Sequence, residues 1–412
     1  MKLTIQVPNL KIYLILFIIY FVCDIMYPAN GIGIASDSAN RIYPQVSMGL
    51  IFLYSIYYIT QNYVTLINCR AFRPFIYYLL MCLLYILFVN GERTMFDNFV
   101  QFMKITLALC IFVFVYICMR NNPQDIKYIY TIYFIIFVYA LIILVRDYYM
   151  MMIAEAANAD EGFDSNSGFM LASLIPMCFL LPMKRVKLFL YVVALGACMV
   201  SGQRAAALGA LISVPIAYKY IKESLSKKDL IPLLLIAFVF LIIALPYIVG
   251  AIENFVLRAS VDADRGDVGS GRSVFWGIVI NSYFSSNPIQ MFLGHGYFAV
   301  NDMLEAEYGM PIGAHNGFLD HLYTFGIIGL VLYLGVYLVI CRIYHDLKNE
   351  NSMYSKVVLM IILIFLFRSA TSHGWLDLSY IPFFMPLAIV LAKQDNEMEL
   401  LDVCNENEID AI

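Results

Sequence analysis

Long apolar runs constrain this sequence more than any other feature. An α-helix needs about 20 apolar residues to cross the roughly 30 Å hydrocarbon layer of a membrane. Runs near this length recur along most of the chain, at residues 10–26, 46–67, 74–90, 99–119, 127–146, 167–183, 188–200, 205–221, 230–250, 322–341, 355–370 and 379–393. The sequence therefore predicts an all-α, polytopic membrane protein with about twelve transmembrane helices.

The composition supports this class and argues against a soluble domain. Hydrophobic residues make up 62% of the 412 residues and charged residues 14%, whereas soluble domains are about 45–50% apolar and about 25% charged. The nine cysteines lie mostly inside apolar runs and form no CxxC pair, so we interpret them as core residues. No motif for a metal, a nucleotide or another cofactor occurs, and we expect no cofactor and no nucleic-acid partner.

The distribution of lysine and arginine predicts the orientation of the helices. With the N-terminus in the cytoplasm, the lysine-rich loops fall on the cytoplasmic side, as the positive-inside rule requires. Guanidinium groups match phosphate and carboxylate oxygens, so arginines gathered on the outer side indicate an anionic ligand there. Taken singly, most of them also fit ordinary snorkelling or loop charge. The outer basic residues are Arg41, Arg93, Lys104, Arg146, Arg204, Arg258, Arg265, Arg272 and Arg368.

This layout predicts four regions. Residues 1–250 would contain transmembrane helices one to nine, 251–321 a large periplasmic loop, 322–393 helices ten to twelve, and 394–412 an acidic cytoplasmic tail. A connection as long as the loop is uncommon and is usually functional or disordered.

The loop itself contains helical patterns. In "SGRSVFWGIVINSYFSSNP", apolar residues recur at helical spacing before a stop at Asn287 and Pro288. This pattern predicts an amphipathic helix that lies in the membrane interface. A glycine turn at "GHGYF" and a short helix over residues 301–308 are expected to follow.

The first candidate site is the sequence "SGQRAAALGALI". Ser201 and Gly202 end one predicted span, and Arg204 opens the next. The free N–H groups and the dipole of a helix N-terminus favour anions, and Arg204 would add a full positive charge there. The alternative is an arginine that snorkels to the lipid headgroups.

The second candidate site is "GSGRSVFW" in the predicted loop. Arg272 follows a flexible Gly-Ser-Gly and belongs to a cluster with Arg258 and Arg265. The cluster could bind an anion, and a solvated loop charge is an equal alternative.

The third candidate site is "GAHNGFLDHLYTFGIIGL", where His315 and Asn316 precede a span. The dipole at a helix N-terminus disfavours imidazolium, so we expect His315 to be neutral and able to act as a general base. Asn316 could cap the helix or bind a sugar hydroxyl. Taken alone, a cap residue in the interface is the simpler interpretation of His315. Further outer-face candidates, in weaker contexts, are His295, His321 and His373.

Together these motifs resemble one known family. "SGQR", "SGR…W", "LGHGY" and "AHNGFLDHLYTFGIIGL" are similar to the O-antigen polymerase and O-antigen ligase family of bacterial membrane glycosyltransferases. Gln203 and Ala205 stand where that family often has Ser and Gly, which leaves the backbone contacts there open. The resemblance implies a glycosyltransferase C-like fold and metal-independent, inverting transfer of glycans from undecaprenyl diphosphate. It also implies a multi-pass protein of the bacterial inner membrane with its active site facing the periplasm.

The resemblance assigns roles to individual residues. Arg204 and Arg272 match arginines of the family, and His315 matches the histidine of its "HN" motif, so Arg204 and His315 are the expected catalytic residues. The implied partners are an undecaprenyl-diphosphate-linked oligosaccharide, membrane lipids and a chain-length regulator protein. The residues expected to bind diphosphate or sugar are Arg272, Arg258, Arg265, Asn316 and His295.

Four functions stay open on the sequence alone. We favour an O-antigen polymerase that joins lipid-linked repeat units, because polymerases are numerous and diverge to fit each repeat unit. An O-antigen ligase would instead transfer the finished chain to lipid A core. A polysaccharide transporter or flippase fits less well, because two corresponding broken helices are not evident in the sequence. A scaffold of an export complex is the fourth.

Overall fold

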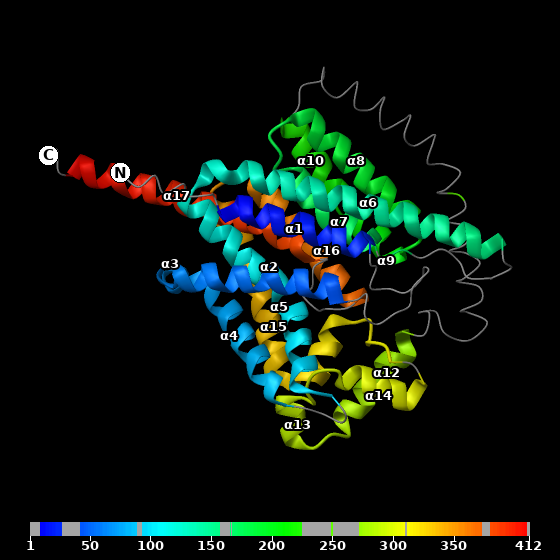
Figure 1. Cartoon of the computed structure of the whole chain (residues 1–412). Coiled ribbons are helices and arrows are strands. Elements are labelled where there is room, and N and C mark those ends of the chain that lie inside the picture. Colours follow the sequence, from blue (N-terminus) through cyan, green and yellow to red (C-terminus); the bar gives the residue numbers. More distant parts are fainter. Residues whose placement is uncertain are drawn as a thin grey trace.

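The computed structural model describes residues 9–26, 42–88, 93–156, 165, 167–224, 249, 272–309, 311–372 and 380–409. Within them every regular element is a helix (Figure 1), which confirms the predicted all-α class. The long helices are α1 (Asn9–Met26), α2 (Ile42–Gln61), α4 (Arg73–Leu84), α5 (Met95–Asn121), α6 (Ile126–Ala156), α7 (Ser167–Cys178), α8 (Lys184–Val200), α9 (Arg204–Ile212), α10 (Val214–Ser224), α15 (Gly317–Asn349), α16 (Tyr354–Thr371) and α17 (Ile381–Ile409). The shorter ones are α3 (Tyr63–Asn68), η2 (Arg70–Phe72), η3 (Tyr85–Leu87), η4 (Pro123–Asp125), α12 (Arg272–Phe284), α13 (Pro288–Leu293) and α14 (Ala299–Tyr308).

Several helices have the length and composition of membrane spans. Among the described residues, four helical segments qualify: 95–121, 123–149, 317–349 and 354–371. Two shorter apolar helices cover 73–87 and 167–178. The membrane class is therefore supported, while the full set of about twelve spans and the periplasmic loop stay predictions. The predicted span 230–250 lies almost wholly outside the described residues.

Helix α5 forms the centre of the bundle. Every residue from Ile105 to Ile117 is at most 2% exposed, because other helices surround α5 and α17 packs along its length. Aromatic rings provide much of this packing, and the ring of Phe114 stacks on Tyr13 of α1 with centroids 4.1 Å apart. A helix that is apolar all round, as α5 is, can be buried on every side.

The predicted span 205–221 is interrupted in the structure. It consists of α9 and α10, with a turn at Ser213 between them. Pro215 has no N–H to donate to the carbonyl of Leu211, and its ring crowds that carbonyl, so an unbroken helix is disfavoured here. The Ser213 hydroxyl donates instead to the carbonyl oxygen of Ala210 at 2.6 Å, which satisfies one backbone group at the break.

Helices α12, α13 and α14 form a lobe beside the start of α15, at the bottom of Figure 1. The lobe has its own small core, in which Phe275, Val279 and Tyr283 of α12 are buried at a spacing of four residues. Val300 and Leu304 of α14 complete it. The predicted amphipathic helix and the predicted short helix near 301–308 are thus confirmed as α12 and α14; their place in a membrane interface stays a prediction.

Helix α15 is broken at Gly326, where φ is 67° and ψ is −167°. The loop between α13 and α14 crosses this break. His295 N–H donates to the carbonyl oxygen of Tyr323 at 3.0 Å, and Gly296 N–H donates to that of Thr324 at 2.9 Å. These bonds satisfy main-chain carbonyls that lose their helical partners at the break. The predicted glycine turn is confirmed, since Gly294 and Gly296 both have positive φ; the break in α15 was not predicted.

Candidate functional site

His315 occupies a sharp turn between the lobe and α15. Its φ of 52° lies in the left-handed region, which few non-glycine residues adopt. Two hydrogen bonds fix the residue before it: Trp276 Nε1–H donates to the Ala314 carbonyl at 2.9 Å, and Ala314 N–H donates to Asp320 Oδ1 at 2.9 Å. The buried Asp320 and the Trp276 side chain of α12 together fix the backbone next to His315, and so the direction of the His315 side chain.

Asn316 is the N-cap of α15. Its side-chain oxygen accepts hydrogen bonds from the backbone N–H groups of Phe318 at 3.1 Å and Leu319 at 3.2 Å. Of the two roles that the sequence left open for Asn316, capping is the one seen in the structure, and sugar binding stays a prediction. The cap begins a helix directly after His315, so His315 lies at the positive end of the α15 dipole, as expected.

Arg272 belongs to the same lobe as His315. It is the first residue of α12 and is half-buried. One turn further along, Trp276 bonds to the residue that precedes His315, and the ring of Phe275 lies 6.4 Å from the His315 ring, centroid to centroid. Two predicted site residues separated by 43 positions in the chain are therefore brought to neighbouring parts of one small fold.

His295 makes contacts that support the lobe. Its ring stacks on Tyr323 of α15, with centroids 4.2 Å apart, and Nε2 forms a hydrogen bond with Ser286 Oγ at 2.9 Å. Burial lowers the pKa of His295, so the ring is neutral at pH 7. These contacts attach the loop to the first half of α15, and a substrate-binding role for His295 stays a prediction.

His321, one of the further outer-face candidates, is a packing residue in the structure, and a role for it on the outer face stays a prediction. It is fully buried and stacks on Tyr333 with ring centroids 3.8 Å apart. Nδ1–H donates to the Gly317 carbonyl at 2.6 Å, and Nε2 accepts from the Tyr78 hydroxyl at 2.7 Å. The sequence could not distinguish this from an exposed position, because both fit the mouth of a helix. His373 lies outside the described residues.

The "SGQR" sequence forms the predicted helix start. Gly202 has a φ of 72°, Gln203 is the N-cap residue, and α9 begins at Arg204. The turn packs against the start of α7, where the Ser201 carbonyl accepts from Ser165 N–H at 3.0 Å. A Cβ at Gly168 would lie 2.2 Å from Ser201 Oγ, so only glycine allows this approach. The side chain of Arg204, and all of Arg258 and Arg265, lie outside the described part of the chain.

The two candidate regions are linked through α16. Helix α9 packs against α16, and α16 packs against α15, whose start follows His315. The predicted arrangement of Arg204 and His315 around a shared cavity stays a prediction, because the side chain of Arg204 lies outside the described residues.

Residues 189–334 match the family model of O-antigen ligase. Arg204, Arg272 and His315 all fall inside the matched segment. This match supports the resemblance of the chain to the O-antigen ligase and polymerase family. A comparison with curated proteins finds no match.

The matched segment contains both "SGQR" and "AHNGFLD", so it bears out the resemblance drawn from these motifs. Proteins of this family are membrane glycosyltransferase-like enzymes, so the chain is interpreted as an enzyme rather than a scaffold. Within the described residues, no three or more His, Cys, Asp or Glu side chains gather in a group that could bind a metal ion. The polar groups near His315 include the Trp276 indole, the Asn316 amide and the Asp320 carboxylate.

Arg368 is a buried cation beside α9 that the sequence listed among the outer arginines but did not place. It lies near the end of α16 and is 7% exposed. Its guanidinium lies over the Tyr380 ring at 3.9 Å and over the Phe169 ring at 5.3 Å, and Nη1 donates to Ser173 Oγ at 2.8 Å. Because Phe169 packs against the first turn of α9, Arg368 brings positive charge close to the helix start at Arg204.

Proposed function

We propose that this protein is an O-antigen polymerase. It would join undecaprenyl-diphosphate-linked repeat units at the periplasmic face of the bacterial inner membrane. The single observation that carries the proposal is the position of His315: a strained turn, fixed by Trp276 and Asp320, at the N-terminus of a helix and inside the segment that matches the family.

The proposed reaction is metal-independent, inverting glycosyl transfer. A sugar hydroxyl of the acceptor attacks the anomeric carbon of the donor, and the bond from that carbon to the diphosphate oxygen breaks. The attacking hydroxyl must lose its proton as the new glycosidic bond forms. A neutral imidazole at the positive end of a helix dipole can accept this proton, and such a base contributes about 10²–10⁴-fold in rate.

The leaving group is a lipid diphosphate with at least two negative charges. Preorganised arginines can stabilise the charge that develops on it. Arg204 at the α9 start and Arg272 at the α12 start are proposed for this role, and each is also at a helix N-terminus, which favours anions. Arg258 and Arg265 are proposed as further contacts, and the buried Arg368 adds to the positive potential beside α9.

An O-antigen ligase is the second candidate function, and the description of the matching family favours it as much as the polymerase. The two reactions share a donor and differ in the acceptor. Deletion of the gene distinguishes them, because loss of all chains beyond one repeat unit indicates the polymerase. Full-length chains that accumulate on the lipid carrier, with none on lipid A core, would instead establish the ligase.

Replacement of Arg204 with alanine is expected to lower the transfer rate by about 10²–10³-fold, the range measured when one transition-state donor is removed. The rate of glycosidic bond formation by purified protein with lipid-linked repeat units measures this. Replacement of Arg342, an exposed arginine on α15 that pairs with Asp346, is the matched control. Equal rates for the Arg204 variant and the wild type would contradict the assignment.

Removal of divalent metal ions is expected to leave the activity unchanged. Arginines supply the positive charge in the proposed mechanism, so the same assay with excess EDTA should form product at the wild-type rate. Activity that disappears with EDTA and returns with added magnesium would show that a metal ion carries the diphosphate charge. Activity without ATP would also separate the enzyme from a pump.

A further inference from the structure

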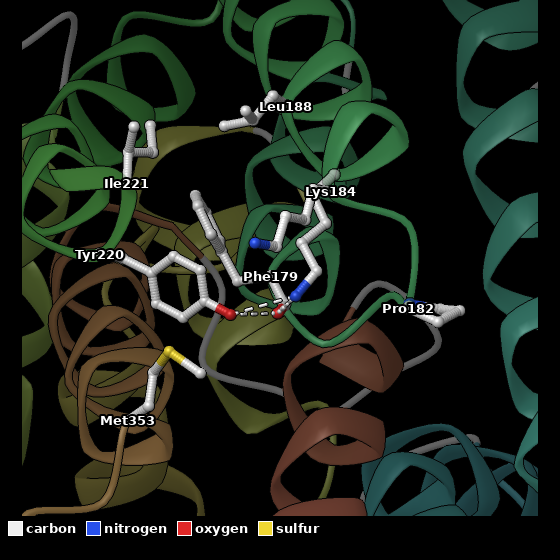
Figure 2. A pocket seen from close by; sticks show the side chains of 8 residues that line it. Phe179, Pro182, Lys184, Leu188, Tyr220, Ile221 and Met353 are labelled. Carbon is white, nitrogen blue, oxygen red and sulfur yellow. Dashed lines mark hydrogen bonds between the residues drawn. The ribbon is translucent and has the colours of Figure 1, made fainter. Parts of the chain in front are cut away.

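A small cavity lies at the end of α8 remote from the candidate site. It has a volume of about 120 Å³ and lies between the α7–α8 turn, the end of α10 and the α15–α16 turn (Figure 2). Helix α8 has 17 residues, so at 1.5 Å per residue its two ends lie about 25 Å apart. The cavity is at its first turn and Ser201 follows its last, which makes this a separate place in the molecule.

Positive charge gathers at this cavity. Lys184 and Lys187 of α8 line it. Lys187 precedes the predicted span 188–200. Its pKa is lowered, first by burial and then by repulsion from Lys184 and from Lys393 of α17. None of the ion pairs between described residues involves these three lysines. Bringing like charges together costs free energy unless an anion joins them.

Neutral hydrogen-bonding groups fix the geometry of this charge. Lys187 Nζ donates to the Phe179 carbonyl at 2.9 Å and to the Tyr220 hydroxyl at 3.1 Å, and that hydroxyl donates to the same carbonyl at 2.9 Å. Met183, the N-cap residue of α8, makes no side-chain capping bond. The first turn of a helix favours anions, so the helix dipole adds to the charge of the lysines.

The size and lining of the cavity limit what it can bind. Its volume of about 120 Å³ has room for a small polar group such as a phosphate. The rest of the lining is apolar, from Phe179, Pro182, Leu188, Ile221 and Met353. Basic pockets between helices on the cytoplasmic side commonly bind the headgroups of anionic lipids.

We propose that this cavity binds the phosphate group of an anionic membrane lipid. Lys184 and Lys187 contact the phosphate, Lys393 adds long-range attraction, and the apolar lining accommodates the adjoining glycerol backbone. The site is independent of the proposed glycosyl transfer, because it involves none of its residues.

The test is lipid retention by the purified full-length protein. Native mass spectrometry would compare bound phosphatidylglycerol with bound phosphatidylcholine in the wild type and in Lys184→Gln/Lys187→Gln. Each lysine near an anionic headgroup contributes about 1 kcal/mol of attraction, so we expect phosphatidylglycerol retention to fall by about fivefold for each lysine removed. The control is Lys219→Gln/Lys222→Gln, which removes two exposed lysines of α10 and should retain the lipid normally.

Two further measurements keep the test decisive. Met353→Trp fills the cavity without a change of charge and should also reduce lipid retention; Met353 is 45% exposed, so the fold should tolerate the change. If the Lys187 variant fails to fold, Met353→Trp and Lys184→Gln test the proposal in its place. Displacement of the lipid from the wild type by inorganic phosphate would support the proposal, because it would show that the site holds the phosphate group. Equal retention in the wild type and the cavity variants, or equal loss in cavity and control variants, would overturn the proposal.

Discussion

Removal of the His315 imidazole is expected to slow glycosidic bond formation by about 10²–10⁴-fold while the amount of folded protein stays constant. His315→Ala tests this directly, but alanine tolerates the left-handed φ of 52° poorly. His315→Asn is the sharper variant, because asparagine visits that conformation more readily and its amide cannot act as a base. Both should form little or no polymer with lipid-linked repeat units.

The matched control is His345→Ala. His345 lies on the same helix, and 71% of its side chain is exposed, so its loss changes the histidine content without a change near the turn. Protein amount and thermal stability in detergent must be measured for every variant. A His315→Asn protein with normal chain lengths and a normal rate would remove His315 from the mechanism and leave a capping role for the turn.

Replacement of Gly326 with alanine is expected to prevent assembly of the lobe on the bundle. Its φ of 67° and ψ of −167° lie in a region open essentially only to glycine, at a cost of about 1–3 kcal/mol for other residues. A Cβ there would also lie 2.2 Å from the backbone oxygen of Phe292, which no side-chain rotation can relieve. Gly294→Ala should act similarly, because its Cβ would lie 2.3 Å from the Thr324 oxygen. For each variant, strain and clash together should lower the free energy of unfolding by more than ~4 kcal/mol, a loss that few single substitutions cause.

Two other glycines allow the cost of an unfavourable backbone conformation to be measured apart from the cost of a steric clash. Gly309 has a φ of 80°, but a Cβ there meets nothing within 4 Å, so Gly309→Ala should show the conformational cost alone. Gly277 lies inside α12 with the same free space, and Gly277→Ala should stabilise by about 0.5–1 kcal/mol. Thermal stability in detergent measures the series. A Gly326→Ala protein as stable as the Gly309 variant would contradict the close packing of the broken helix.

The sequence predicted the helices well because their signal is local. The apolar runs match α1, α5 and α16 closely, and the spacing of Phe275, Val279 and Tyr283 gave α12. The motif at "SGQR" also predicted a helix that begins at Arg204. In each case neighbouring residues in the sequence are enough to predict the helix, and burial in the bundle stabilises it further.

The features that the sequence did not predict depend on distant partners. The break at Gly326 exists because the backbone at 294–296 supplies hydrogen bonds to it, and the glycine alone could equally lie in an intact helix. The burial of His321 depends on Tyr78, 243 positions earlier. Likewise, Trp276 and Asp320 fix the His315 turn through contacts that no spacing within the motif reveals.

The junction between the lobe and α15 has a consequence for how such an enzyme can diversify. It is made in part by main-chain atoms, since His295 and Gly296 donate from their N–H groups to the carbonyls of Tyr323 and Thr324. Main-chain contacts persist when neighbouring side chains change. Side chains on the outward faces of α12 and α14 can therefore change while the lobe stays attached in the same register. Under the proposed function, this would let the choice of sugar change separately from the attachment of the lobe.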